Sequence, residues 1–130
     1  MRVWVNGCFD ILHVGHIALL KHAKNLHGRD NTLIVGVDTD ARVKASKGES
    51  RPINTVEDRV IMLGQLKMVD KIVVFGSDTE LISELIDNQV DVIVVGEEYR
   101  GRVVGSEHVG LVEYFKRIGD YSTTNIIERK

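Results

Sequence analysis

Short runs of apolar residues alternate along this 130-residue chain with longer segments in which apolar residues recur every three or four positions. The short runs are rich in β-branched residues and predict strands, and the run TLIVGV is apolar on both faces, as in a strand covered by helices on both sides. Strands are predicted over residues 2–6, 32–37, 71–75, 91–95 and 111–115. Helices are predicted over residues 17–26, 56–69, 78–88 and 122–130.

This alternation of strands and helices favours an α/β fold in which right-handed crossovers build a parallel sheet. No repeat, linker or low-complexity tract interrupts the pattern, so we predict a single domain over residues 1–130. Residues 97–110 show no periodicity and are predicted to form a loop. The polar or glycine-rich turns NGCFD, VDTD and VGEEY follow three of the predicted strands. Because ligands of open α/β sheets bind at the carboxyl ends of the strands, we expect these turns to share one functional edge.

Composition and charge narrow the class of protein. The net charge is −2, so no global field favours nucleic acid or an anionic membrane, and any phosphate site must be a local cluster of basic groups. Cys8 is the only cysteine, which excludes an internal disulfide and a cysteine-rich metal site. No apolar run reaches the roughly 18 residues of a membrane span, and the first residues enter a strand without a signal peptide. We therefore expect a cytoplasmic protein with neither nucleic-acid nor membrane partners.

The run HVGH places His13 and His16 at the start of the first predicted helix. Residues three apart on a helix face the same direction, and helix N-terminal N–H groups favour an anion, so the pair predicts a phosphate site with two imidazole donors. A pair consisting of one buried and one solvated histidine is the commoner arrangement in general. Metal ligation is a further alternative, although the segment offers no other cysteine or histidine. Neither a P-loop nor a GxGxxG fingerprint occurs, which argues against a kinase, a GTPase or a dinucleotide oxidoreductase.

The longer run GCFDILHVGH resembles the signature of the cytidylyltransferase-like nucleotidyltransferases, whose HxGH motif binds the triphosphate. STTNII at 122–127 resembles a second signature of that superfamily, and KGESRPIN at 47–54 is similar to the adenylyltransferase domain of the bifunctional ADP-heptose synthesis enzymes. The resemblance covers nearly the whole chain, with the three motifs in the expected order. With the strand–helix alternation, it implies a Rossmann-like five-stranded parallel sheet of order 3-2-1-4-5 with helices on both faces.

The resemblance also implies roles for individual residues. His13 and His16 resemble the histidines that stabilise the reacting α-phosphate and the departing pyrophosphate. Lys47 resembles the lysine that bridges the acceptor phosphate and the NTP phosphates, with Lys44 as a second acceptor-binding candidate. Arg59 resembles an arginine that the family uses near the phosphates. Without the resemblance, these lysines would be read as an ordinary solvated surface.

A nucleotide-binding set follows in the same way. It comprises Gly7, Cys8, Phe9, Asp10, Gly96, Glu97, Ser122, Thr123 and Thr124, with Arg117 added if the nucleotide is CTP. On the residues alone, Cys8 reads as an inert small hydrophobe in or near the core. The Ser-Thr-Thr run reads first as a helix cap, which is also compatible with an anion site.

The implied reaction joins a nucleoside monophosphate from an NTP to a phosphate-bearing acceptor and releases pyrophosphate. An acceptor phosphate monoester is largely dianionic at neutral pH, since its second pKa is about 6, so the reaction requires no general base. Positioning and electrostatics are the protein's contribution, and Mg²⁺ is expected to arrive bound to the NTP rather than on protein ligands.

The nucleotide and the acceptor are the least constrained features. KGESRPIN, the GCFD start, STTNII and the Gly105-Ser106 pair resemble the ADP-heptose-type adenylyltransferases. That resemblance implies ATP and a sugar 1-phosphate similar to heptose 1-phosphate as substrates. Arg117 stands where the glycerol-3-phosphate cytidylyltransferases carry an arginine, which leaves CTP and a phosphorylated polyol as the alternative. A non-catalytic nucleotide-binding module is the alternative from another class, but it would be marked by loss of the histidines or Lys47. The resemblance further implies a homodimer.

Overall fold

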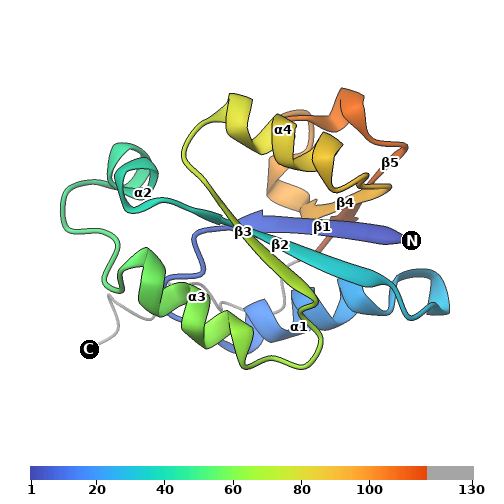
Figure 1. Cartoon of the computed structure of the whole chain (residues 1–130), viewed down its shortest axis with the longest axis horizontal. Coiled ribbons are helices and arrows are strands. Elements are labelled where there is room, and N and C mark those ends of the chain that lie inside the picture. Colours follow the sequence, from blue (N-terminus) through green and yellow to red (C-terminus); the bar gives the residue numbers. More distant parts are fainter. Residues whose placement is uncertain (117–130) are drawn as a thin grey trace.

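A computed structural model describes residues 1–116 of the chain (Figure 1). Its strands form one five-stranded parallel sheet in the order β3-β2-β1-β4-β5. The strand bounds are β1 (Arg2–Gly7), β2 (Thr32–Asp38), β3 (Lys71–Phe75), β4 (Val92–Gly96) and β5 (Leu111–Phe115). The predicted Rossmann-like fold, including the strand order, is confirmed.

Helices cover both faces of this sheet (Figure 1). Their bounds are α1 (Val14–Lys24), α2 (Asp40–Lys47), α3 (Val56–Gly64) and α4 (Asp78–Asp87). In Figure 1, α1 and α3 lie below the sheet and α4 lies above it. Short 3₁₀ turns complete the described chain: η1 (Leu26–Gly28), η2 (Glu97–Tyr99) and η3 (Ser106–His108). No helix among residues 1–116 is both long enough and apolar enough to cross a membrane.

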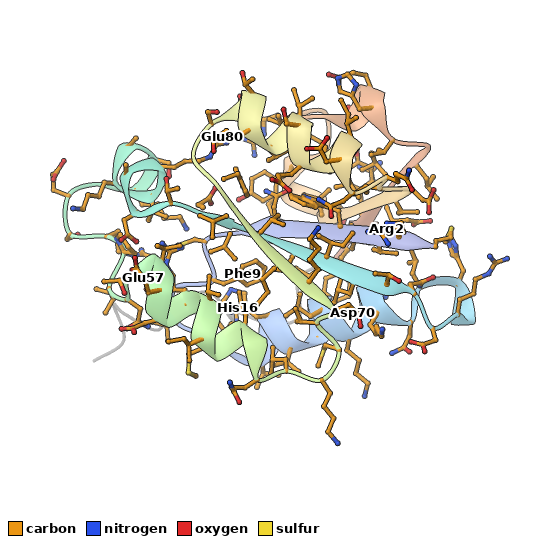
Figure 2. All side chains as sticks on the ribbon, viewed as in Figure 1. Arg2, Phe9, His16, Glu57, Asp70 and Glu80 are labelled. Atoms are coloured by element: carbon orange, nitrogen blue, oxygen red, sulfur yellow. The ribbon has the colours of Figure 1, made fainter. Side chains whose placement is uncertain are left out.

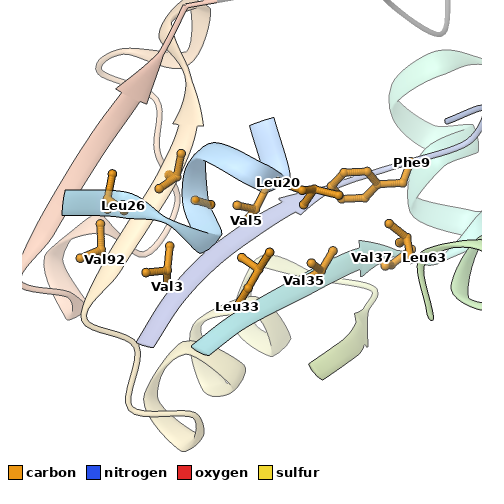
Figure 3. Close-up of a cluster of buried hydrophobic side chains, with 12 residues drawn as sticks. Val3, Val5, Phe9, Leu20, Leu26, Leu33, Val35, Val37, Leu63 and Val92 are labelled. Carbon is orange, nitrogen blue, oxygen red and sulfur yellow. The ribbon is translucent and has the colours of Figure 1, made fainter. Parts of the chain in front are cut away.

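Each face of the sheet has its own apolar core. Under α1 and α3, alternate residues of β1 and β2 such as Val3 and Val35 pack with Leu20 and Leu63 (Figure 3). On the α4 face, Trp4 and Ile34 belong to a second cluster, with Phe75, Leu81, Leu85, Val90 and Ile93. Successive strand residues point to opposite faces, so a strand that is apolar throughout supplies both cores.

The largest differences from the sequence-based expectation concern the helices α1, α2 and α3. α1 begins at Val14 rather than at residue 17, because its first turn is capped by polar groups and carries no apolar period. α3 ends at Gly64 rather than at residue 69, although Leu66, Met68 and Val69 still pack on the core as a turn. α2 was not predicted at all, because Val43 is its single buried residue.

Candidate active site

The carboxyl ends of β1, β2 and β4 lie at one edge of the sheet, as the polar turns predicted. β1 and β2 pair in register up to Gly7 and Val37, so the turn after β1 lies beside Asp38 and the start of α2. Figure 2 shows Phe9 and His16 together beneath the sheet on the side of Glu57, whereas Arg2 and Asp70 lie toward the amino ends of the strands. The candidate site is therefore built on the edge that serves ligands in this class of sheet.

Phe9 sets the direction in which the chain leaves β1. Its φ of 51° lies in the left-handed region, which costs a non-glycine residue roughly 1–2 kcal/mol. Burial of this residue, which is only 4% exposed, offsets that cost. The ring contacts the imidazole of His16, with centroids 5.3 Å apart, and lies so close to Gly7 that a Cβ there would come within 3.3 Å of it. Phe9 thus supports the site from beneath.

His13 and His16 cap the first turn of α1 reciprocally. The Gly15 N–H donates to Nδ1 of His13 (3.1 Å), and the His13 N–H donates to Nδ1 of His16 (3.2 Å). The two rings stack with centroids 3.8 Å apart and planes 27° apart. A neutral imidazole that accepts at Nδ1 carries its proton at Nε2. Both histidines are therefore held as Nε2–H donors beside the N-terminus of α1.

Lys47 brings positive charge toward this turn from the last turn of α2. Burial raises the pKa of the Cys8 thiol, and the charges of Arg59 and Lys47 partly counteract it. Burial likewise raises the pKa of Asp38, against the pull of its ion pair with Arg42 (3.1 Å) and the weaker influence of Lys47. The ammonium of Lys47 therefore lies within electrostatic range of Cys8 and Asp38, at the ends of β1 and β2. Its side chain is exposed, as is that of Lys44.

Arg59 lies at the same edge but is enclosed by protein. Its side chain is fully buried, and its guanidinium donates to the carbonyl oxygens of Cys8, Asp38 and Asn54 and to the carboxylate of Asp40. Four of its five N–H groups are thereby directed at protein acceptors. Arg59 therefore connects the turn after β1 to the start of α2. We call a residue that connects segments of the site in this way a framework residue.

Asp10 is a second buried charge with internal partners. Its carboxylate accepts hydrogen bonds from the backbone N–H groups of Ile53 and Asn54, each at 2.8 Å, and pairs with Arg51 at 3.3 Å. Its own carbonyl accepts from Nδ2 of Asn54 at 2.8 Å. These contacts connect the histidine turn to the loop that follows Lys47.

The third part of the edge lies after β4. Gly96 has its backbone beneath the side chain of Glu98, so that a Cβ at this position would come within 2.5 Å of the carboxylate. Glu97 begins η2 and pairs with Arg100 at 3.7 Å, and Arg100 in turn stacks on Tyr114 at 3.8 Å from the ring centroid. Residues 97–110, whose sequence shows no periodicity, thus contain the two short 3₁₀ turns η2 and η3.

The charged and polar residues predicted to contact the phosphates or the nucleotide differ in where the structure places them. His13, His16 and Lys47 share one edge and present donors there, while Arg59 and Asp10 are buried among protein partners. Arg117, Ser122, Thr123 and Thr124 lie outside the described residues. The framework residues Asp40, Arg51 and Asn54 had not been predicted, because their partners, Arg59 and Asp10, come near them only on folding. Within residues 1–116, no group of three His, Cys, Asp or Glu side chains gathers as a metal site.

The sheet is that of a Rossmann-like α/β protein, and its carboxyl edge, where ligands bind in this class, carries two imidazole donors and a lysine. More particularly, the chain belongs to the cytidylyltransferase-like family, whose model matches residues 4–129, and it is a nucleotidyltransferase.

Relatives are found among both sequences and solved structures. The bifunctional protein HldE of Campylobacter fetus is 45% identical over 130 residues, and that of Helicobacter hepaticus is 45% identical over 129. These matches cover 98% and 97% of this chain but only 27% and 26% of the relatives, so the chain spans about a quarter of their length. A lipopolysaccharide core biosynthesis protein from Thermoplasma volcanium is similar in structure, with a TM-score of 0.72 and 28% identity, over 91% of this chain and 98% of that one.

Proposed function

We propose that this domain transfers AMP from ATP to a sugar 1-phosphate resembling heptose 1-phosphate and releases pyrophosphate. The observation that carries the proposal is the pair of stacked imidazoles, both held as Nε2–H donors at the N-terminus of α1 with Lys47 nearby. The choice of ATP and a sugar phosphate rests on the sequence similarity to the HldE proteins and on the KGESRPIN segment.

In the proposed reaction, an oxygen of the acceptor phosphate attacks the α-phosphorus of the NTP. The new O–P bond forms as the bond from the α-phosphorus to the bridging oxygen breaks, and its electron pair leaves with pyrophosphate. The acceptor is already an anion, so no proton has to be removed from it. Mg²⁺ enters bound to the NTP and neutralises part of the triphosphate charge.

The residues of the chain provide alignment and charge. The Nε2–H groups of His13 and His16 donate to phosphate oxygens, where negative charge accumulates in the transition state. Lys47 lies between two polyanions and reduces their mutual repulsion. Lys44 is the second acceptor-binding candidate, and Ser122, Thr123 and Thr124 are proposed to hold the terminal phosphates. Arg59 acts in this scheme by positioning backbone groups.

The second candidate function is that of a glycerol-3-phosphate cytidylyltransferase using CTP. The specific observation in its favour is Arg117, five residues before Ser122 in the sequence. If CTP is the substrate and Arg117 recognises it, Arg117→Ala should abolish CTP use; if ATP is the substrate, the effect on turnover should be mild.

A pyrophosphate-release assay over the four NTPs, each combined with phosphorylated sugars and polyols, tests both candidates. We expect release with ATP and an aldose 1-phosphate. Release with CTP and glycerol 3-phosphate alone would establish the second candidate. No release with any pair would contradict catalysis and favour a binding module.

We further propose a homodimer that acts in the cytoplasm, where the NTP substrates are abundant. Light scattering at tens of micromolar protein should report twice the mass of one chain. A monomer mass under those conditions would contradict this part of the proposal.

A further inference from the structure

Asp10 was expected to bind nucleotide, and the structure shows that it also has several buried partners within the protein. Its side chain is 0% exposed, and it lies three residues before His13 in the turn after β1. A buried carboxylate is tolerated only when paired and hydrogen-bonded. Here Oδ2 accepts from Ile53 N–H and Arg51 Nε, while Oδ1 accepts from Asn54 N–H. Both oxygens are thus engaged by the loop after α2, and a carboxylate would in any case repel a phosphate.

The partners of Asp10 follow Lys47 closely in the sequence. Asn54 is seven residues beyond Lys47, and its side-chain amide also donates a hydrogen bond to the Asp10 carbonyl. Arg59 reinforces the same junction, because its guanidinium holds the carbonyls of Cys8 and Asn54 at once. The turn that carries the histidines and the loop that follows the lysine are therefore tied together through buried polar contacts.

We propose that Asp10 is a positioning residue that fixes the histidine turn relative to the Lys47-bearing segment, and so aligns the acceptor phosphate with the bound triphosphate. This inference deepens the proposed function and rests on it. The histidines cap α1 through their own hydrogen bonds, which do not involve the Asp10 carboxylate. Loss of that carboxylate therefore disturbs the alignment of the two substrates more than it lowers the affinity for the nucleotide.

The substitution Asp10→Asn isolates this effect. Asparagine has nearly the same shape but a single acceptor oxygen, so its amide NH₂ must face either the Asn54 N–H or the donors from Ile53 and Arg51. A misalignment of about 1 Å costs roughly 10²-fold in rate. We expect kcat to fall by about 10²-fold while the dissociation constant of Mg·ATP, measured by calorimetry, changes by less than about threefold.

Asp70→Asn is the matched control. Asp70 also accepts from a backbone N–H, that of Leu33, and pairs with a cation, Lys24, but at the opposite edge of the sheet (Figure 2). It should reduce stability while leaving kcat and ATP affinity unchanged. If Asp10→Asn does not fold, Asn54→Ala removes only the side-chain bond to the Asp10 carbonyl, and we expect a severalfold loss of kcat at unchanged ATP affinity.

The outcomes separate the two proposals. An inactive wild-type protein overturns the proposed function and this role with it. If the wild type is active and folded Asp10→Asn is equally active, the positioning role alone is overturned. The same holds for Asn54→Ala where that variant replaces Asp10→Asn. Loss of ATP affinity in parallel with kcat also overturns it, since that result assigns Asp10 to nucleotide binding.

Discussion

At the scale of single residues, the two ring nitrogens of His13 and of His16 have different hydrogen-bonding roles. Nδ1 accepts a hydrogen bond within the cap of α1, which places the ring proton on Nε2. The sequence could predict that His13 and His16 face the same direction. It could not predict which nitrogen of each would carry the proton, because that depends on the cap geometry.

Substituting His16 separates capping from catalysis. His16→Ala should lower kcat by roughly 10²–10³-fold, the loss expected for one preorganised donor to transition-state charge, with a smaller change in KM for the NTP. His16→Asn offers an amide oxygen in place of Nδ1, so it should recover thermal stability without recovering kcat. His22→Ala, an exposed histidine on the same helix, should retain full turnover. Near-full turnover of both His16 variants would contradict the assignment.

The framework residues illustrate what a sequence withholds at this scale. Arg59 and Asp10 stand in motifs, so a functional role could be predicted for them from resemblance. Their burial and their partners depend on chain segments that meet only after folding. Arg59 donates to the Cys8 carbonyl, and Asp10 accepts from the backbone N–H of Asn54. The sequence alone does not distinguish a charged residue that contacts a phosphate from one that holds the site together.

At the scale of elements, glycines in the sheet and in a helix should respond in opposite ways to the same change. A Cβ at Gly36 in β2 would lie 2.3 Å from the Trp4 ring, whereas at Gly64 in α3 the nearest atom is Ile72 Cδ1 at 3.9 Å. Gly36→Ala should therefore destabilise the fold by about 1–3 kcal/mol through overpacking, and Gly64→Ala should stabilise it by up to about 1 kcal/mol through helix propensity. Urea unfolding measures both, and equal effects would contradict this packing.

The contact between α1 and the start of β3 gives a prediction for pH. Burial acts to raise the pKa of Asp70, but hydrogen bonds from Lys24 and from the Leu33 N–H outweigh it and lower the pKa. A carboxyl whose pKa is lower in the folded state stabilises the fold above its unfolded pKa of about 3.9, and this contribution is lost as the pH falls through the folded value. Asp70→Asn should therefore cost about 1 kcal/mol at pH 7 and almost nothing near pH 2, since the site is partly exposed and screened. Urea titrations of both proteins across that range provide the measurement, and a difference that persists at pH 2 would contradict the assignment.

The elements themselves were predictable to the extent that apolar residues mark them. The five strands and α4 follow their apolar patterns closely. α2 was missed because a helix lying on the sheet edge buries only Val43, so its sequence shows no apolar face. The end of α3 was misplaced because Leu66 and Val69 continue the apolar spacing as turn residues that still pack on the core.

At the scale of the whole molecule, the order of strands places the functional residues more than any one motif does. β1 lies at the centre of the sheet between β2 and β4, so the turns after these strands converge on one edge. The alternation of elements predicts a parallel sheet, but it leaves several strand orders open. The resemblance carried by GCFDILHVGH and the later motifs selected the order that the structure has.

The nucleotide preference is a property of the folded whole and can be read from thermal stability. A ligand present at 100 times its dissociation constant stabilises the folded state by about 2.7 kcal/mol, which for a chain of this length corresponds to a rise in Tm of roughly 5–10 °C. Saturating Mg·ATP should produce such a rise, adenosine a much smaller one because the phosphate contacts are absent, and Mg·CTP an intermediate one. His13→Ala should reduce the ATP-dependent rise, whereas His22→Ala should preserve it. A larger rise with Mg·CTP than with Mg·ATP would reverse the proposed preference and leave the class of enzyme unchanged, because the triphosphate and its donors are common to both.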